Sequence, residues 1–301
     1  GLAEKKIAII GENGYRWSVS HLAVINGIGI SVPLDRLLPE DEIMALLERG
    51  SVSAVIFDGS FLPVMKAAHE RFPDIHAFIC MKPSKKTEEM KVLDFGEARF
   101  YRFEELLTSG RYALLNGDEA YIKREIDPEQ IASLLFTSGT TSQSKGVMLR
   151  NRNIAMDIVA LAKVEKFKVG SRLLSILPLH HTFENTCGLV YPLYMGGCIC
   201  VCDGLRYIQQ NMEEYKINMM IGVPTLFESF YKKVIDSINK QKKMKTIRVM
   251  IKITRALRRV KIDLRRVVFK KIHKAFGGEF TIGICGAAPI DPAIITFFDD
   301  I

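Results

Sequence analysis

The chain has 301 residues, of which 48% are hydrophobic and 25% are charged, and its formal net charge is +8. This balance excludes a disordered chain, and no apolar run approaches the roughly 18 residues that span a bilayer. Six scattered cysteines argue against a disulfide scaffold and favour a reducing cytoplasm, and the first six residues show no apolar signal-peptide core.

Short apolar runs alternate with amphipathic stretches along nearly the whole chain, which favours an α/β fold. In the first part we expect strands at residues 7–10, 30–32, 52–57 and 77–80. Helices are expected at residues 17–27, 39–50, 61–71 and 103–107. The stretch 82–125 is otherwise more polar and irregular.

A second alternating series begins near residue 126. Its expected strands are residues 132–136, 172–176, 198–202 and 218–221. Its expected helices are residues 151–163, 185–194, 205–215 and 225–237. We therefore predict two successive parallel-type sheets with flanking helices, in subdomains of residues 1–125 and 126–301.

Three cysteines, Cys198, Cys200 and Cys202, alternate with Ile199 and Val201. This spacing places the three thiols on one face of a strand. A metal site would need a converging fourth ligand, and the sequence has no second paired-cysteine knuckle. We therefore favour buried core thiols over a metal site.

The most informative stretch follows the strand expected at residues 132–136. Between Thr137 and Gly146 it holds six hydroxyl side chains, two glycines and one lysine. Glycines permit a tight turn that points backbone N–H groups inward, and hydroxyls and Lys145 suit the oxygens of a polyphosphate. It is not a Walker loop, because Ser144 precedes Lys145 and Gly146 follows it. A plain polar turn between two strands is the alternative.

The same stretch resembles the signature loop of the adenylate-forming (AMP-binding) superfamily, which includes acyl-CoA synthetases, peptide-synthetase adenylation domains and luciferases. The typical signature has glycine and proline where this chain has Ser142 and Ser144. The resemblance implies that ATP and a carboxylic acid form an acyl-adenylate and pyrophosphate, and that coenzyme A then accepts the acyl group. The loop would hold the departing pyrophosphate electrostatically, together with Mg²⁺.

This resemblance assigns roles residue by residue. Lys145 is implied to be catalytic as well as phosphate-binding, and Thr140 is implied to be a magnesium ligand. The implied phosphate-binding set is Thr137, Ser138, Gly139, Thr140, Thr141, Ser142, Ser144 and Lys145.

Further stretches match the same superfamily in the same order along the chain. Residues 7–17 and 27–35 resemble its early strands, and residues 218–225 resemble the strand and Val-Pro-Thr turn that border its acyl pocket. Residues 284–290 resemble the turn that lies on the adenine, although Cys285 stands where glycine is usual. The implied adenine-binding residues are Gly286, Ala287, Ala288 and Pro289.

Residues 177–184 resemble the long-chain acyl-CoA synthetase form of another motif. The resemblance implies that His181 lines the adenylate and acyl pocket as a catalytic-site residue, and that the acid is a long-chain fatty acid. His180 is expected at the surface or behind the pocket. Glu184 matches the motif, and its simplest role is to cap a helix. An aryl acid or an amino acid remains the alternative substrate.

The resemblance covers essentially the whole chain, but several family segments are not in it. The magnesium-binding glutamate, the ribose-binding aspartate and the small C-terminal domain with its adenylation lysine would all follow residue 301. We therefore expect this polypeptide to be a fragment with little or no ligase activity on its own.

One segment makes the protein basic. Residues 232–274 hold 17 lysines and arginines against two acids, while the rest of the chain holds 25 basic and 32 acidic residues. Apolar residues recur there at helical spacing, which predicts amphipathic helices with a cationic face. The hypotheses are a solvated face, peripheral docking of a cytoplasmic protein on an anionic membrane, and a nucleic-acid-binding module. No specific nucleic-acid partner is expected, because no recognition motif is present. A non-catalytic nucleotide-binding scaffold is the further alternative.

Overall fold

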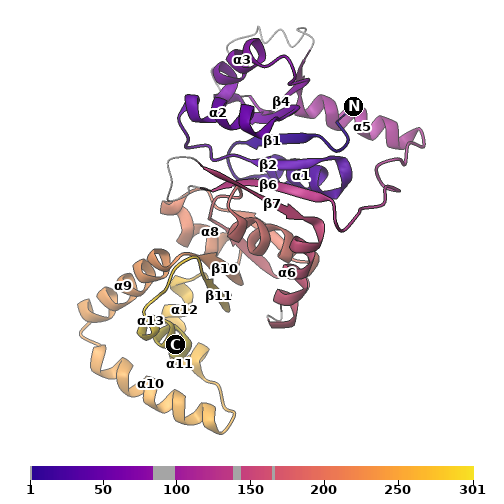
Figure 1. The fold of residues 1–301 in the computed structure, drawn as a ribbon. Coiled ribbons are helices and arrows are strands. Elements are labelled where there is room, and N and C mark those ends of the chain that lie inside the picture. The colour runs from indigo at the N-terminus through magenta and orange to yellow at the C-terminus, as the bar shows by residue number, and fades with distance from the viewer. Residues whose placement is uncertain (1, 84–98, 138–143, 165–166) are drawn as a thin grey trace. The chain divides into compact units, whose positions relative to one another are not determined.

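The computed structural model describes residues 2–83, 99–137, 144–164 and 167–301 of the chain (Figure 1). The chain divides into two compact units. Unit 1 comprises Gly1–Leu161 and Pro178–Thr182, and unit 2 comprises Ala162–Leu177 and Phe183–Ile301. The division therefore falls after Leu161 rather than near residue 125, because residues 131–150 pair with the first sheet.

The described part of unit 1 contains a seven-stranded sheet in the order β5-β4-β3-β1-β2-β6-β7. All neighbouring strands are parallel except β6 and β7, which are antiparallel. The predicted α/β fold is confirmed, but this sheet is mixed because the chain turns back directly after the phosphate-loop stretch. Its strands are β1 (Lys6–Ile10), β2 (Ile30–Pro33), β3 (Ala54–Asp58), β4 (Ala77–Lys82), β5 (Phe100–Arg102), β6 (Ile131–Thr137) and β7 (Lys145–Arg150).

Helices flank this sheet, and the central strands are buried as continuous apolar runs, as expected for parallel strands covered by helices. Residues 8–10 of β1 and residues 54, 55 and 57 of β3 have no exposed surface. The helices are α1 (Tyr15–Ala23), the π-helix η1 (Val24–Ile28), α2 (Glu40–Gly50), the 3₁₀ turn η2 (Gly59–Phe61), α3 (Leu62–Arg71), α5 (Phe103–Leu115) and α6 (Asn151–Val164).

The described part of unit 2 contains a four-stranded parallel sheet in the order β11-β10-β8-β9. Its strands are β8 (Arg172–Ser175), β9 (Cys198–Val201), β10 (Met219–Gly222) and β11 (Ile282–Cys285). The central strand β10 is fully buried, whereas β9 and β11 are edge strands. The strands expected in this region are therefore confirmed.

The helices of unit 2 agree with the predicted positions, with two differences. Residues 184–190 form a π-helix, and the amphipathic helices predicted in the basic segment include two short helices, residues 265–268 and 270–275, separated at Phe269. The helices are η3 (Glu184–Val190), α7 (Tyr191–Tyr194), η4 (Leu205–Tyr207), α8 (Ile208–Glu214), α9 (Pro224–Lys240), α10 (Met244–Arg259), α11 (Arg265–Val268), α12 (Lys270–Ala275) and α13 (Pro292–Asp300).

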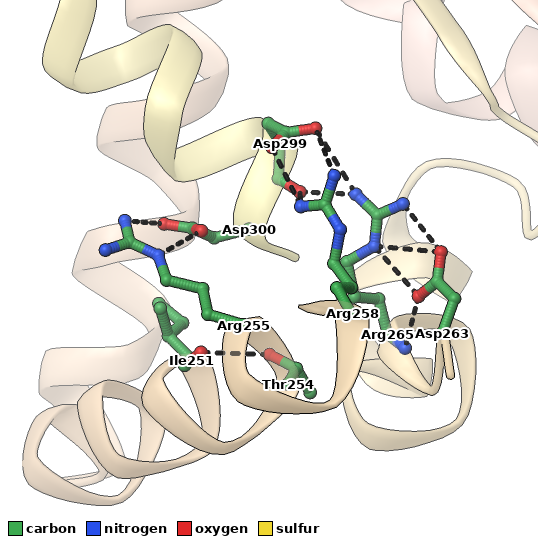
Figure 2. Close-up of polar contacts among 8 residues, drawn as sticks. All are labelled: Ile251, Thr254, Arg255, Arg258, Asp263, Arg265, Asp299 and Asp300. Carbon is green, nitrogen blue, oxygen red and sulfur yellow. Dashed lines mark hydrogen bonds and ion pairs between the residues drawn. The ribbon is translucent and has the colours of Figure 1, made fainter. Parts of the chain in front are cut away.

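An ion-pair network attaches α10 to the end of α13 (Figure 2). The guanidinium of Arg255 donates to both carboxylate oxygens of Asp300 at 2.5 Å. Arg258 Nη1 lies 2.8 Å from Asp299 Oδ2, and Arg265 bridges Asp263 and Asp299. These bidentate contacts orient one face of α10 toward α13.

No described helix is both long enough and apolar enough to cross a membrane.

Candidate active site

The phosphate-loop stretch is the connection of the β6–β7 hairpin. Thr137 and Lys145 are paired residues at its base, and Thr137 Oγ1 donates to the Lys145 carbonyl at 3.5 Å. The predicted ligands Ser138, Gly139, Thr140, Thr141 and Ser142 lie outside the described residues. The hairpin therefore brings together the first and last side chains of the predicted phosphate site.

The described side of this hairpin is anchored to α2. Arg49 donates to the Ser144 carbonyl at 2.6 Å, and its guanidinium lies 5.8 Å from the centroid of the Phe136 ring. Lys145 is exposed and forms no salt bridge with any described residue. An exposed ammonium that no described carboxylate pairs with is chemically available to an anion.

The histidine pair belongs to the short part of unit 1 that comprises residues 178–182. The backbone N–H of Leu179 donates to the Asn13 side chain at 3.0 Å, and His180 Nε2 lies 3.6 Å from Asp35 Oδ2. Asn13 and Asp35 follow the carboxyl ends of β1 and β2, where ligands bind in open α/β sheets. Residues 178–182 therefore lie at the carboxyl end of the first sheet.

The two histidines differ from each other in burial. The side chain of His180 is only 12% exposed, whereas His181 is exposed. Burial, with the neighbouring His181, lowers the pKa of His180 to about 4, despite the opposing effect of Asp35. His180 is therefore neutral at neutral pH and forms no ion pair with Asp35, and its ring centroid lies 4.2 Å from that of His181. The pocket role of His181 remains a prediction.

Glu184 does not cap the helix that it begins. Its side chain is fully buried, and its Oε1 accepts a hydrogen bond from Ser175 Oγ at 2.6 Å. The backbone N–H groups of Ile176 and Leu177 also donate to this carboxyl. Burial nevertheless raises the pKa of Glu184 to about 7. Glu184 thus fastens the end of β8 to the start of η3, within unit 2.

The predicted adenine turn follows β11 in unit 2. Gly286 donates its N–H to the Gly222 carbonyl at 3.2 Å, while Ala287, Ala288 and Pro289 are exposed. Ala287 has a φ of 69°, a left-handed conformation that is costly for a residue with a side chain. Small exposed residues let a flat ligand approach the backbone closely.

Sequence reasoning missed why Gly286 must be small. A Cβ placed there would lie 2.6 Å from Cζ of Phe183, and the next nearest atoms also belong to that ring. Phe183 precedes Glu184 in the motif of residues 177–184. The motif aromatic therefore packs on the adenine turn, a pairing for which single-sequence patterns carry no signal.

Cys198 and Cys200 on β9, and Cys202 directly after it, are less buried than expected. Cys198 is exposed, and Cys200 and Cys202 are half-buried, because β9 is an edge strand. Burial and the neighbouring Cys198 raise the pKa of Cys200 to about 11. Among the described residues, no group of three or more His, Cys, Asp or Glu side chains could hold a metal ion.

Unit 2 also contains a cavity of about 650 Å³, whose lining includes the charged side chains of Asp263, Arg265 and Asp299. It adjoins β11 and is lined by aromatic side chains of α9 and the segment after α12, including Phe227, Phe230, Phe276 and Phe280.

A sequence profile described as AMP-binding enzyme matches residues 2–301. The chain belongs to the AMP-binding enzyme family.

Several curated relatives are named as ligases of long-chain fatty acids. This chain is 26% identical over 311 residues to long-chain-fatty-acid–CoA ligase 5 of Rattus norvegicus, covering 97% of this chain and 44% of the relative. It is 25% identical over 238 residues to a chloroplastic long-chain-fatty-acid–acyl-carrier-protein ligase of Arabidopsis thaliana, covering 76% of this chain and 32% of that protein. The chain thus spans less than half the length of these relatives.

Solved structures of low sequence identity share the fold. The inhibitor-bound N-terminal domain of FACL13 from Mycobacterium tuberculosis is 15% identical, with a TM-score of 0.64, and the match covers 99% of the present chain and 61% of that chain. The adenylation domain of a carboxylate reductase from Mycobacterium chelonae is also 15% identical, with a TM-score of 0.74. This match covers 99% of the present chain and 45% of that chain. The two-sheet architecture is therefore that of adenylate-forming N-terminal domains.

Proposed function

We propose that this chain provides the ATP- and acid-binding part of a ligase that activates a long-chain fatty acid and transfers it to coenzyme A. The supporting observation is the β6–β7 hairpin, in which Thr137 and Lys145 flank the hydroxyl-rich connection and Lys145 forms no salt bridge with a described residue. The names of the curated relatives support a long acyl chain.

In the proposed first step, a carboxylate oxygen attacks the α-phosphorus of ATP, an acyl-adenylate forms and pyrophosphate leaves. Lys145 and the donors of residues 137–144 stabilise the negative charge that builds on the pyrophosphate. In the second step, the thiol attacks the acyl carbonyl, a thioester forms and AMP leaves. Gly286 to Pro289 would lie against the adenine, and His181 would face the acyl-adenylate.

Magnesium is part of this proposal through Thr140, which lies outside the described residues. When bound, the ion would neutralise charge on the triphosphate oxygens. Its presence is testable as a requirement for added Mg²⁺ in ATP-dependent pyrophosphate exchange.

The substrate is tested by ATP–pyrophosphate exchange with saturated fatty acids of increasing length, aryl acids and amino acids. The assay uses this chain alone and the whole protein that contains it. We expect exchange by the whole protein with long fatty acids, and little or no exchange by the chain alone. Exchange only with an aryl or amino acid would overturn the fatty-acid assignment.

The thiol acceptor has two candidates, because one curated relative is named for coenzyme A and another for acyl carrier protein. Thioester formation measured with each acceptor in parallel distinguishes them. We expect coenzyme A to be the acceptor, and transfer only to the carrier protein would contradict this part of the proposal.

A further inference from the structure

The basic segment 232–274 occupies one part of unit 2, from α9 through α10 and α11 to α12. Its 17 basic residues outnumber its two acids, and α10 itself contains no acidic residue. Such an excess of one charge on neighbouring helices attracts an anionic partner.

The inner face of α10 is already used by the fold. Arg255 and Arg258 are paired with Asp300 and Asp299 (Figure 2), and Thr254 is buried beside them. Because these ion pairs hold this face against α13, they fix the rotation of α10 about its own axis. The same contacts therefore determine that the opposite face of α10 points away from α13.

The outer face of α10 carries an apolar stripe. Val249, Ile253 and Val260 are 56%, 54% and 64% exposed, and their spacing of four and seven residues aligns them along the helix. One edge of the stripe is bordered by a row of exposed basic residues, Lys245, Arg248, Lys252 and Arg259. No other described element of unit 2 covers these side chains.

Further exposed aliphatic side chains follow α10 in the sequence. Ile262, Leu264 and Val267 are 46%, 40% and 73% exposed. Lys261, Lys270 and Lys271 are exposed in the same segment. We call Val249, Ile253, Val260, Ile262, Leu264 and Val267, with the exposed basic residues of 245–271, the basic–apolar surface.

We propose that the basic–apolar surface docks this protein on an anionic lipid bilayer. A stripe of exposed aliphatic side chains beside a cationic row suits the boundary between acyl chains and anionic headgroups. Nucleic acid would neutralise the charges but leave the aliphatic stripe in water, and its recognition commonly uses stacking aromatic side chains, which this stripe lacks. The proposal does not depend on the proposed ligase activity.

Two variants of the full chain separate the contributions of charge and apolar contact. The first replaces Arg248, Lys252 and Arg259 with Gln. The second carries Val249→Gln and Ile253→Gln and keeps the net charge. A control with Lys66→Gln, Arg111→Gln and Lys163→Gln loses the same charge at exposed positions elsewhere.

Binding is measured by co-sedimentation with vesicles of phosphatidylcholine, with or without about one-third phosphatidylserine, an anionic lipid. We expect the parent and the control to bind the anionic vesicles. Each basic residue near an anionic surface contributes about 1 kcal/mol of binding free energy. The first variant lacks three such residues and should bind more weakly by on the order of 100-fold. The second variant is also weaker, and pure phosphatidylcholine binds poorly.

An independent readout guards against misfolded variants. Trp17 is the single tryptophan and is 2% exposed, so it adds a constant background to the fluorescence. In an Ile253→Trp variant, the fluorescence of the introduced tryptophan should shift to the blue with anionic vesicles only. Equal binding by the parent and both test variants, or DNA binding without vesicle binding, would overturn the proposal.

Discussion

The buried carboxyl of Glu184 makes the stability of unit 2 depend on pH. Its pKa in the folded chain is raised from 4.5 to about 7 by burial, so the fold disfavours the charged form. The stability contributed by the neutral carboxyl is complete below about pH 4.5 and is lost as the pH rises through about 7.

A Glu184→Gln variant cannot ionise at this position. Between about pH 4.5 and 8, the parent should therefore lose about 3 kcal/mol of unfolding free energy relative to the variant. Chemical denaturation across this pH range checks the difference, with exposed Glu70→Gln as a control. Parallel stability curves for the parent and Glu184→Gln would contradict the expected result.

The close contact between Gly286 and Phe183 gives a second prediction at this scale. Gly286→Ala should destabilise unit 2 by about 1–3 kcal/mol, because its Cβ would overlap the ring. The loss should be smaller in a Phe183→Leu background, which makes room for the methyl group. A double-mutant cycle measured by denaturation tests this coupling, and strict additivity would refute it.

At the scale of elements, α10 depends on carboxylates that remain ionised. The guanidinium of Arg258 holds the pKa of Asp299 below its usual range, and that of Arg265 does the same for Asp263. Groups with lowered pKa values stabilise the fold above their unfolded pKa, and this contribution is lost as the pH falls.

We therefore expect α10 to separate from α13 in acid before the β-sheet of unit 2 opens. Hydrogen-exchange protection in α10, compared with β10, should fall between neutral pH and about pH 3. Asp299→Asn should lower this protection already at neutral pH, whereas exposed Asp236→Asn on α9 should not. Unchanged protection in Asp299→Asn would show that packing alone holds α10.

For the whole molecule, local patterns predicted the α/β fold and most strands, because buried parallel strands such as β10 are continuous apolar runs. They could not predict that residues 145–150 turn back antiparallel, since hairpin pairing and crossover leave similar local patterns. The family order of motifs pointed to the β6–β7 connection, His181 and the turn at Gly286.

Contacts between segments distant in sequence were beyond sequence reasoning. Burial distinguishes His180 from His181 although the two residues are adjacent and chemically identical. The Phe183 ring on Gly286 and the Glu184 carboxyl on Ser175 likewise arise from packing within unit 2. The exposure of Cys198 follows from the edge position of β9, which depends on strand order.

The central claim is that the hairpin connection from Thr137 to Lys145 binds the triphosphate of ATP. Calorimetric titration of the full chain with ATP and Mg²⁺, comparing Lys145→Gln with exposed Lys163→Gln, tests it most directly. Loss of a charge-assisted hydrogen bond predicts about 10- to 100-fold weaker binding for Lys145→Gln and parent-like binding for Lys163→Gln. Equal ATP affinity in the parent and Lys145→Gln would contradict this account.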